Sequence, residues 1–407
     1  MTSPPLDRPP AAGPAGPVLL ESGRTTYELI RPLEQTVHGE LLLARRRFDT
    51  NTGDYVVLKR LSRECREEDY RRLMEEVAIT ARLRHPGIAG MHDVDGSVGD
   101  PYLVLEYVEG HRLDTLIEAA AQASKPLTEA FACYVGSEVA DALHHAHELT
   151  SEEGRWLRLV HRNVSPRTIM VGSRGEVKLT DFGTVWAALP GRQPTEDDAL
   201  PGNLAYASPE LTRKGTIDGR TDQFSLAAVL LHLLTGRPLV EGSDRVTHEL
   251  HELRQRMEEA VAMGPGDEAA TALVRDLRGR IHKLTWGFVD RIRALTPRDV
   301  AEATRAVPVG LRPILRRALS PRRTDRYASC AEFGHELRLH LWRVGQFYGR
   351  PEAASEVSAL LRAPSRGRSR SAVARSSTAG HKSGGAGQGR RAGSSAEGRR
   401  KKDTPSR

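Results

Sequence analysis

The sequence predicts an α+β fold in two lobes, with a small β-rich N-terminal lobe and a larger α-rich C-terminal lobe. Apolar and polar residues alternate over much of the first hundred residues, which is typical of half-buried strands. Beyond residue 127 the apolar residues recur mainly at helical spacing. Strands gathered in one part of a chain and helices in another are typical of the α+β class.

Five strands and one helix are expected in the N-terminal lobe. Each strand alternates in polarity, and "TNTGD" at residues 50–54 has the composition of a hairpin turn. The helix covers about residues 67–85, because Leu73, Val77 and Leu83 fall near one face. The expected strands cover residues 26–33, 38–48, 55–61, 89–94 and 101–108.

The C-terminal lobe begins near residue 107 and is predicted to be mostly helical. Two short strand signals return within it, at residues 168–172 and 176–183. The expected helices cover about residues 127–149, 220–236, 245–262, 268–283, 310–319 and 329–342.

Both ends of the chain are predicted to be disordered. Residues 1–26 form a leader rich in Pro and Gly, and residues 346–407 form a basic Ser/Gly/Arg tail with few residues able to build a core. Residues 362–407 hold 13 basic and two acidic residues, a net charge of +11, so residues 1–361 carry −4 of the total of +7. Truncation after about Gly349 is therefore expected to leave the melting temperature nearly unchanged.

Composition disfavours several classes of protein. Cys65, Cys133 and Cys330 lie far apart without a CxxC pair, so neither a zinc site nor a disulfide framework is indicated. This usage fits a reducing compartment, and we expect a cytoplasmic protein. The most apolar stretch, residues 224–234, is too short to span a bilayer. No aromatic residue lies among the charges of the tail, so disorder is favoured over nucleic-acid binding there.

A series of motifs runs through residues 27–345. The motifs are "VVLK" at 56–59, "LEYV" at 105–108, "HRN" at 161–163, "DFG" at 181–183 and "SPE" at 208–210. In this order and register they resemble the landmarks of bacterial Ser/Thr protein kinases, and the segment before "HRN" resembles a subgroup that includes myxobacterial kinases. The resemblance implies a protein-kinase-like fold, with an N-lobe over 27–106 and a C-lobe over 107–345.

The resemblance also implies roles for single residues. Lys59 would pair with nucleotide phosphates and with Glu76, and Asp181 would bind a metal ion. Taken singly, Lys59 could be an ordinary strand-edge lysine and Glu76 a solvated helix carboxylate; the order of the whole series favours the kinase interpretation. The nucleotide-binding residues would be Gly39, Lys59, Glu106 and Val108. The residues that would brace the larger lobe are Glu210, Asp222 and Arg326, the first and last as a structural salt bridge.

The glycine-rich loop of the family is degraded in this sequence. The G-x-G-x-x-G pattern should fall on residues 34–39, which read "EQTVHG", so Gly39 alone matches. Glycines let backbone amides approach phosphates closely, whereas Glu34 and Thr36 bring Cβ atoms. Glu34 also brings a negative charge near an anionic ligand, unless it turns into water. Val57 and Leu41 are larger than the residues usual in the family's adenine slot.

The catalytic loop departs from the family as well. Asn163 stands at the position of the base aspartate, and an amide does not accept a proton as a carboxylate does. Thr168 replaces the asparagine that ligates a second Mg²⁺, and a neutral hydroxyl is a poorer ligand. Ser165 replaces a common lysine. ATP and Mg²⁺ are the cofactors that the resemblance implies, and this chain is expected to bind them weakly or not at all.

These departures favour a pseudokinase that scaffolds or allosterically regulates a protein partner, such as an active kinase or a kinase substrate. The alternative is a weak Ser/Thr kinase that transfers the γ-phosphoryl group of ATP to protein hydroxyls by positioning alone. A third hypothesis, recruitment to nucleic acid through the basic tail, is the least favoured.

A helical insert over about residues 245–300 is longer than the connection usual in the family. Its apolar residues are spaced for one face. His248 and His251 lie three residues apart, but the spacing is not H-E-x-x-H, so a surface helix is favoured over a metal site.

Overall fold

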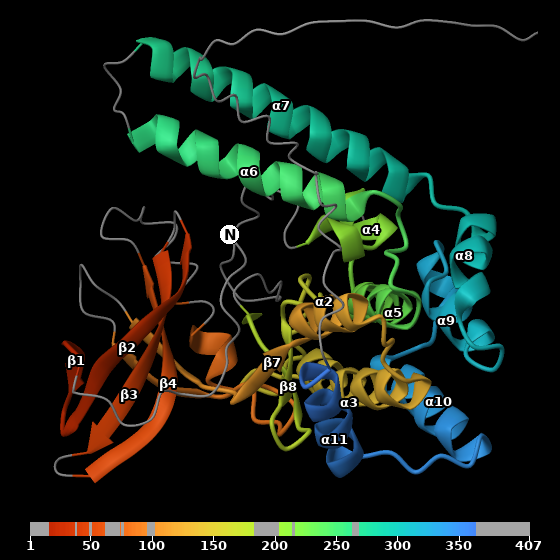
Figure 1. Cartoon of the computed structure of the whole chain (residues 1–407), viewed down its shortest axis with the longest axis horizontal. Coiled ribbons are helices and arrows are strands. Elements are labelled where there is room, and N and C mark those ends of the chain that lie inside the picture. The colour runs from red at the N-terminus through yellow and green to blue at the C-terminus, as the bar shows by residue number, and fades with distance from the viewer. Residues whose placement is uncertain are drawn as a thin grey trace, which may run out of the picture. The chain divides into compact units, whose positions relative to one another are not determined.

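The computed structural model describes residues 16–36, 39–48, 51–61, 74, 77–95, 102–182, 203–213, 216–262 and 268–363. Within these residues the two-lobed α+β layout predicted from the sequence is present, with strands at the N-terminal end and helices beyond (Figure 1). The chain divides into two units, residues 1–366 and 367–407, and everything described below belongs to the first.

The N-lobe sheet has six strands in the order β1-β2-β3-β4-β6-β5, all paired antiparallel. One face of this sheet carries a hydrophobic core cluster. The cluster includes Tyr27, Leu42, Val56, Leu58 and Val104. The five predicted strands are confirmed. The strands are β1 (Val18–Ser22), β2 (Thr25–Thr36), β3 (Gly39–Phe48), β4 (Asn51–Leu61), β5 (Met91–Asp95) and β6 (Tyr102–Glu106).

The sixth strand, β1, corrects the predicted leader. It pairs with β2 and buries Leu20 against the sheet, so residues 18–26 belong to the folded lobe. Its short, irregular pairing, with a register shift between Val18 and Leu20, weakened the period-two signal that would have identified it. The predicted helix over 67–85 lies mostly outside the described residues; residues 77–80 are helical and bury Val77 against Leu103.

A second, three-stranded sheet carries the loops that resemble the catalytic machinery. It consists of β7 (Gly110–Arg112), β8 (Ile169–Gly172) and β9 (Val177–Leu179) in sequence order. The segment 161–168 leads into β8, and Asp181 follows β9 by two residues. The hairpin β8–β9 therefore fixes both segments at one end of the same small sheet.

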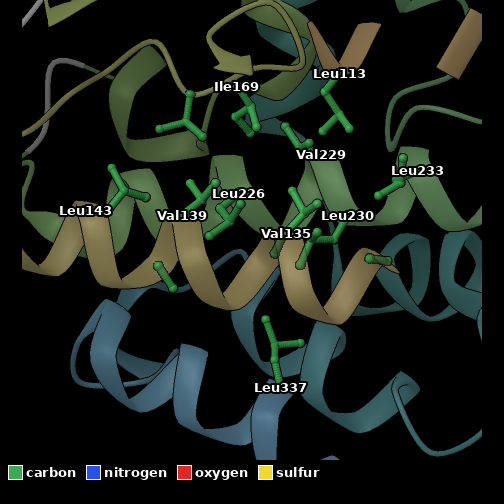
Figure 2. Packing of buried hydrophobic residues seen from close by; sticks show 14 of the residues in the cluster. Leu113, Val135, Val139, Leu143, Ile169, Leu226, Val229, Leu230, Leu233 and Leu337 are labelled. Carbon is green, nitrogen blue, oxygen red and sulfur yellow. The ribbon is translucent and has the colours of Figure 1, made fainter. Parts of the chain in front are cut away.

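The C-lobe core is built around α3 (Glu129–His147) and α5 (Gly219–Thr235), which are buried along most of their length. Figure 2 shows Val135, Val139 and Leu143 of α3 facing Leu226 and Leu230 of α5. Helices hydrophobic on nearly every side are typical of a domain centre rather than a surface. The other helices include α2 (Leu113–Ala123), α4 (Pro209–Thr212), α8 (Pro297–Ala303), α9 (Arg312–Ala318) and α10 (Cys330–Arg343).

The insert forms a helical hairpin of α6 (Ser243–Ala262) and α7 (Glu268–Arg293), which lie side by side (Figure 1). Both predicted helices are confirmed, and α7 continues ten residues past its predicted end. Those last residues include Phe288, Val289 and Ile292, which pack against Leu204 and other residues of the C-lobe. This packing stabilises the last ten residues of α7, for which the spacing of apolar residues in the sequence did not indicate a helix.

A last helix, α11 (Arg350–Leu361), corrects the predicted tail. It buries Ala353, Val357 and Leu360 in the main C-lobe core, so the boundary of the tail at residue 346 is wrong. Its first turn lies so close to the β8–β9 turn that a Cβ at Gly175, where φ is +80°, would overlap the backbone of Arg350. In the described part of the chain, no helix is long and apolar enough to cross a membrane.

Candidate functional site

A cavity of about 620 Å³ lies between the N-lobe sheet and the loops at the end of the small C-lobe sheet. This volume is within the range of pockets that hold small molecules and cofactors. Every predicted nucleotide, catalytic and metal residue except Glu76, which is outside the described residues, lines it. These residues are Gly39, Lys59, Glu106, Val108, Asn163, Ser165, Thr168 and Asp181. Glu210, Asp222 and Arg326 lie elsewhere in the C-lobe.

Strand register places Lys59 at the cavity. Lys59 pairs with Leu41 on β3 and Leu103 on β6, while its neighbour Leu58 is fully buried in the sheet core. Because side chains alternate across a strand, burying Leu58 turns Lys59 and Val57 to the opposite, cavity face. Leu41, Val57 and other apolar side chains form one wall, so the residues predicted to narrow an adenine slot do lie at this cavity.

The amide of Asn163 is engaged at both ends. Its Nδ2 donates to Oδ2 of Asp181 at 2.9 Å, and its Oδ1 accepts the backbone N–H of Asn203 at 3.1 Å. A carboxylate could not make the first of these bonds unless it or Asp181 were protonated. The sequence reasoning identified Asn163 as a lost base, but it did not identify this bridge. The residue thus joins the two loops that meet at the cavity.

The backbone around Asn163 keeps a strained geometry. Arg162 and Asp181 have φ of +64° and +62°, a left-handed conformation costing on the order of 1 kcal/mol or more for each non-glycine residue. The buried carboxylate of Asp222 holds the loop by accepting the backbone N–H groups of His161 and Arg162 at 2.8 and 2.9 Å. Asp222 therefore acts structurally, by shaping the loop.

Two buried histidines complete this support. His147 Nε2 donates to Asp222 at 2.8 Å. Burial raises the pKa of the Asp222 carboxyl, but the hydrogen bonds from His147 and the His161 backbone outweigh it and hold that pKa below its usual value. The His161 ring donates to the carbonyl oxygen of Thr180 and stacks edge-on against Phe182. Burial lowers the pKa of His161, which is consistent with a neutral ring.

Thr168 lines the cavity beside Ser165, but its hydroxyl is bonded to the backbone of its own loop. The Thr168 hydroxyl accepts the N–H of Ser165 at 3.1 Å and faces the carbonyl oxygens of Asn163 and Ser165 at 3.0 and 3.1 Å. Both side chains are buried. An oxygen already engaged with three backbone groups is a poor metal ligand, so the residues present do not fit a second Mg²⁺ site. For one ion, Asp181 remains as the carboxylate of the predicted metal set.

The carboxylate of Glu34 is ion-paired across the cavity. It lies 3.1 Å from the guanidinium of Arg167 in the catalytic loop and 3.9 Å from that of Arg112. The expected charge near an anionic ligand is therefore present, but it is paired to the C-lobe instead of turned into water. Arg112, Arg167 and Asn203 were not singled out in the sequence, since only the fold brings them to the cavity.

Glu210 and Arg326 form the predicted structural salt bridge. Their two nitrogen–oxygen contacts are 2.7 and 2.9 Å, and the Arg326 side chain is fully buried over the ring of Phe224. Thr221 also donates to the carboxylate at 3.1 Å. Arg326 also donates to the carbonyl oxygens of Arg220 in α5 and of Ser320. The salt bridge therefore connects α4, which holds Glu210, to α5 and to the loop before α10.

His248 and His251 of the insert lie in different surroundings. His248 pairs with Glu252 one turn along the same helix at 3.2 Å, and both side chains are exposed. Among the described residues, no group of three or more His, Cys, Asp or Glu side chains is arranged to hold a metal ion. His251 lies instead at the cavity, together with Arg254.

The β-rich lobe, the helical lobe and the cavity between them define the layout of a protein kinase domain. The family model for that domain matches residues 38–297, more than half of the chain, so this protein belongs to the protein kinase family. The match begins one residue before Gly39 and includes both helices of the insert, α6 and α7.

Among known relatives, the chain is similar to bacterial kinases. It is 31% identical over 198 residues to serine/threonine-protein kinase PrkC of Bacillus subtilis, covering 49% of this chain and 28% of PrkC. It is 27% identical over 250 residues to the probable serine/threonine-protein kinase PknB of Lactococcus lactis, covering 61% and 38%. Tyrosine-protein kinase MasK of Myxococcus xanthus is 29% identical over 278 residues, covering 63% and 43%.

The matched segments therefore span less than half the length of these relatives. Among solved structures, the PknI kinase domain of Mycobacterium tuberculosis is 25% identical, with a TM-score of 0.46, covering 77% of this chain and 95% of that one. The predicted membership of the bacterial Ser/Thr kinase family is thus confirmed.

Proposed function

We propose that this chain is a pseudokinase, a protein kinase fold that regulates or scaffolds a protein partner without efficient phosphoryl transfer. The observation that carries the proposal is the bridge made by Asn163. The side-chain N–H of Asn163 donates to Asp181, and its side-chain oxygen accepts the backbone N–H of Asn203. No carboxylate stands at the base position, and removal of a general base typically costs about 10²–10⁴ in rate.

The state of the metal-binding residues supports the same proposal. Asp181 accepts a hydrogen bond that an incoming cation would have to displace, and the Thr168 hydroxyl is committed to its own loop. Phosphoryl transfer depends on neutralised charge and on positioned phosphates. With the glycines of residues 34–39 largely replaced as well, three parts of the machinery are weakened together.

Phosphotransfer by purified protein tests the proposal. Wild type is compared with Lys59→Met as background, with the double variant Asn163→Asp, Thr168→Asn, and with a quadruple variant that adds Glu34→Gly and Thr36→Gly. We expect wild type to equal the background, the double variant to gain little, and the quadruple variant to gain more, since these parts serve one transition state. Wild-type transfer to a generic basic protein well above the background would overturn the proposal.

A weak Ser/Thr kinase is the second candidate. The retention of Lys59 and Asp181 at one cavity of nucleotide size favours it. A loose transition state needs positioning more than a base, so slow transfer is physically accessible. Wild-type activity that is lost in both Lys59→Met and Asp181→Asn would support this candidate over the first.

We further propose a cytoplasmic protein whose partner is another protein, either an active kinase or a kinase substrate. A cleft that binds without turnover suits regulation through a second conformation of the same fold. Affinity capture with the full chain, compared with an Asn163→Asp chain, tests whether partners depend on the bridged loop. Salt-dependent DNA binding by the full chain, if lost on deletion of residues 364–407, would favour the nucleic-acid hypothesis instead.

A further inference from the structure

Helix α6 of the insert forms one wall of the cavity. Thr247, Leu250, His251 and Arg254 all line it, as do Glu34 of β2 and Gly39 of β3. At 100° per residue, these four positions fall on one face of the helix. The insert was predicted only as a surface helix, and neither the family resemblance nor the catalytic loop accounts for this contact.

Apolar packing holds the insert against the C-lobe. Leu250 and Leu253 of α6 are buried, and Val246 packs against the cluster that α7 forms with the C-lobe. At the base of the hairpin, Phe288, Val289 and Ile292 of α7 form a cluster with Leu204 and Ala207. Leu204 follows Asn203, whose N–H is bound by Asn163. The insert is therefore attached to the same segment that closes the catalytic loop.

Among the described residues that line the cavity, the guanidinium of Arg254 has no ion-pair partner. Each lining carboxylate has a partner: Glu34 has Arg167, Glu40 has Arg60, Glu106 has Lys178, and Asp181 accepts the amide of Asn163. Arg254 is exposed, and within the described parts of the chain its side chain makes no ion pair or hydrogen bond.

We propose that α6 supplies Arg254, with Thr247 and His251 beside it, as a contact for the phosphate groups of a nucleotide bound in the cavity. The proposal deepens the proposed function, since it rests on the cleft retaining ligand binding without turnover. An arginine offers several N–H donors to a phosphate and needs no glycine-rich backbone to approach it. The insert thus replaces part of what residues 34–39 have lost.

Calorimetric titration of the full chain with ATP and with adenosine, at low ionic strength and without a divalent cation, tests this role. Adenosine is the control ligand because it lacks phosphates. We expect Arg254→Ala to weaken ATP binding about tenfold, or about 1.4 kcal/mol, as the loss of one charge-assisted contact predicts. Adenosine binding should not change, and Arg254→Lys should retain part of the affinity.

Arg256→Ala is the matched control, because Arg256 is an exposed arginine on the same helix, about 200° around from Arg254 and outside the cavity lining. Equal weakening by Arg254→Ala and Arg256→Ala would reduce the effect to general charge and overturn the proposal. So would a wild type that binds no ATP at millimolar concentration, or an Arg254→Ala chain that binds ATP as tightly as wild type. Absence of phosphotransfer would leave it intact, so the two proposals fail independently.

Discussion

Nδ2 of Asn163 lies 2.9 Å from Oδ2 of Asp181, and this hydrogen bond joins two loops that meet at the cavity. The backbone is strained at Asp181, and the carboxylate of Asp222 accepts the N–H of Arg162, next to Asn163. The shape of the loop is therefore supported by residues other than Asn163. An amide at position 163 can donate to the carboxylate of Asp181, whereas a second carboxylate could do so only if one of the two were protonated.

Asn163→Asp should make thermal stability depend on Mg²⁺. Two carboxylates at this distance repel, by about 5 kcal/mol at 3 Å if the effective dielectric is about 20 and less where water screens them. We expect a lower melting temperature without a divalent cation and recovery with Mg²⁺, followed by differential scanning fluorimetry. Asn163→Ala is the control, since it loses the bond without adding charge. A Mg²⁺ response of wild type as large as that of Asn163→Asp would contradict this account.

Glu34→Gln should strengthen ATP binding severalfold. The substitution removes a negative charge from the cavity and releases the guanidinium group of Arg167, while Arg112 keeps its closer ion pair with Asp114 at 3.1 Å. Stability should change by less than about 1 kcal/mol, because the pair with Arg167 is largely exposed. Calorimetry with ATP measures the gain, and Asp54→Asn, which breaks an exposed pair away from the cavity, is the control. Unchanged or weaker ATP binding would show that Glu34 does not oppose the ligand.

Two truncations should separate α11 from the residues that follow it. Ending the chain after Ala363 should leave the melting temperature nearly unchanged, since the described core ends with α11. Ending it at Gly349 should destabilise the fold by about 3–6 kcal/mol, the usual value for burying two or three aliphatic side chains. The shorter chain also loses Glu356, which accepts the N–H and hydroxyl of Thr128 at the start of α3. Chemical unfolding of both chains measures the difference, and equal stability would refute the role of α11.

Removal of Arg326 should destabilise the C-lobe strongly. Arg326→Met leaves the carboxylate of Glu210 without its buried partner, a change that typically costs about 3–5 kcal/mol. The double variant Arg326→Met, Glu210→Gln should recover part of the loss, because no charge is then left unpaired. Urea unfolding of the two variants and wild type tests this. A double variant less stable than Arg326→Met alone would contradict it.

Stability should fall as the pH drops below about 6.5. Burial lowers the pKa of the imidazoles of His161 and His85 below their ordinary value of 6.5. Between the two pKa values, the unfolded chain binds protons at these imidazoles and the folded chain does not. The free energy of unfolding therefore decreases with falling pH and levels off below the pKa of the folded state. Above pH 7 both states are neutral and these groups contribute nothing. Urea unfolding at pH 7 and pH 5, with His161→Gln as a variant of smaller pH dependence, checks the sign.

The sequence by itself determined the two lobes, five strands of the N-lobe sheet, and most of the C-lobe helices. Periodicity identified these elements because each buries one face or, for α3 and α5, nearly its whole surface. Motif order and spacing identified the family and the residues that meet at the cavity, from Lys59 to Asp181. The bridge between Glu210 and Arg326 was also predictable from the family series. The short, irregular strand β1 and the helix α11 were not predicted from the sequence, because each is defined by the core that it packs against.

Only the tertiary structure decided how the altered residues are used. Residues 34 and 167 are 133 positions apart, and no local pattern indicates that their charges meet. The partners of Asn163 come from two loops, and the contact of Arg254 with the cavity depends on where α7 packs against Leu204. Hydrogen bonds and ion pairs act over about 3–4 Å, so they are fixed by the folded backbone rather than by neighbours in the chain.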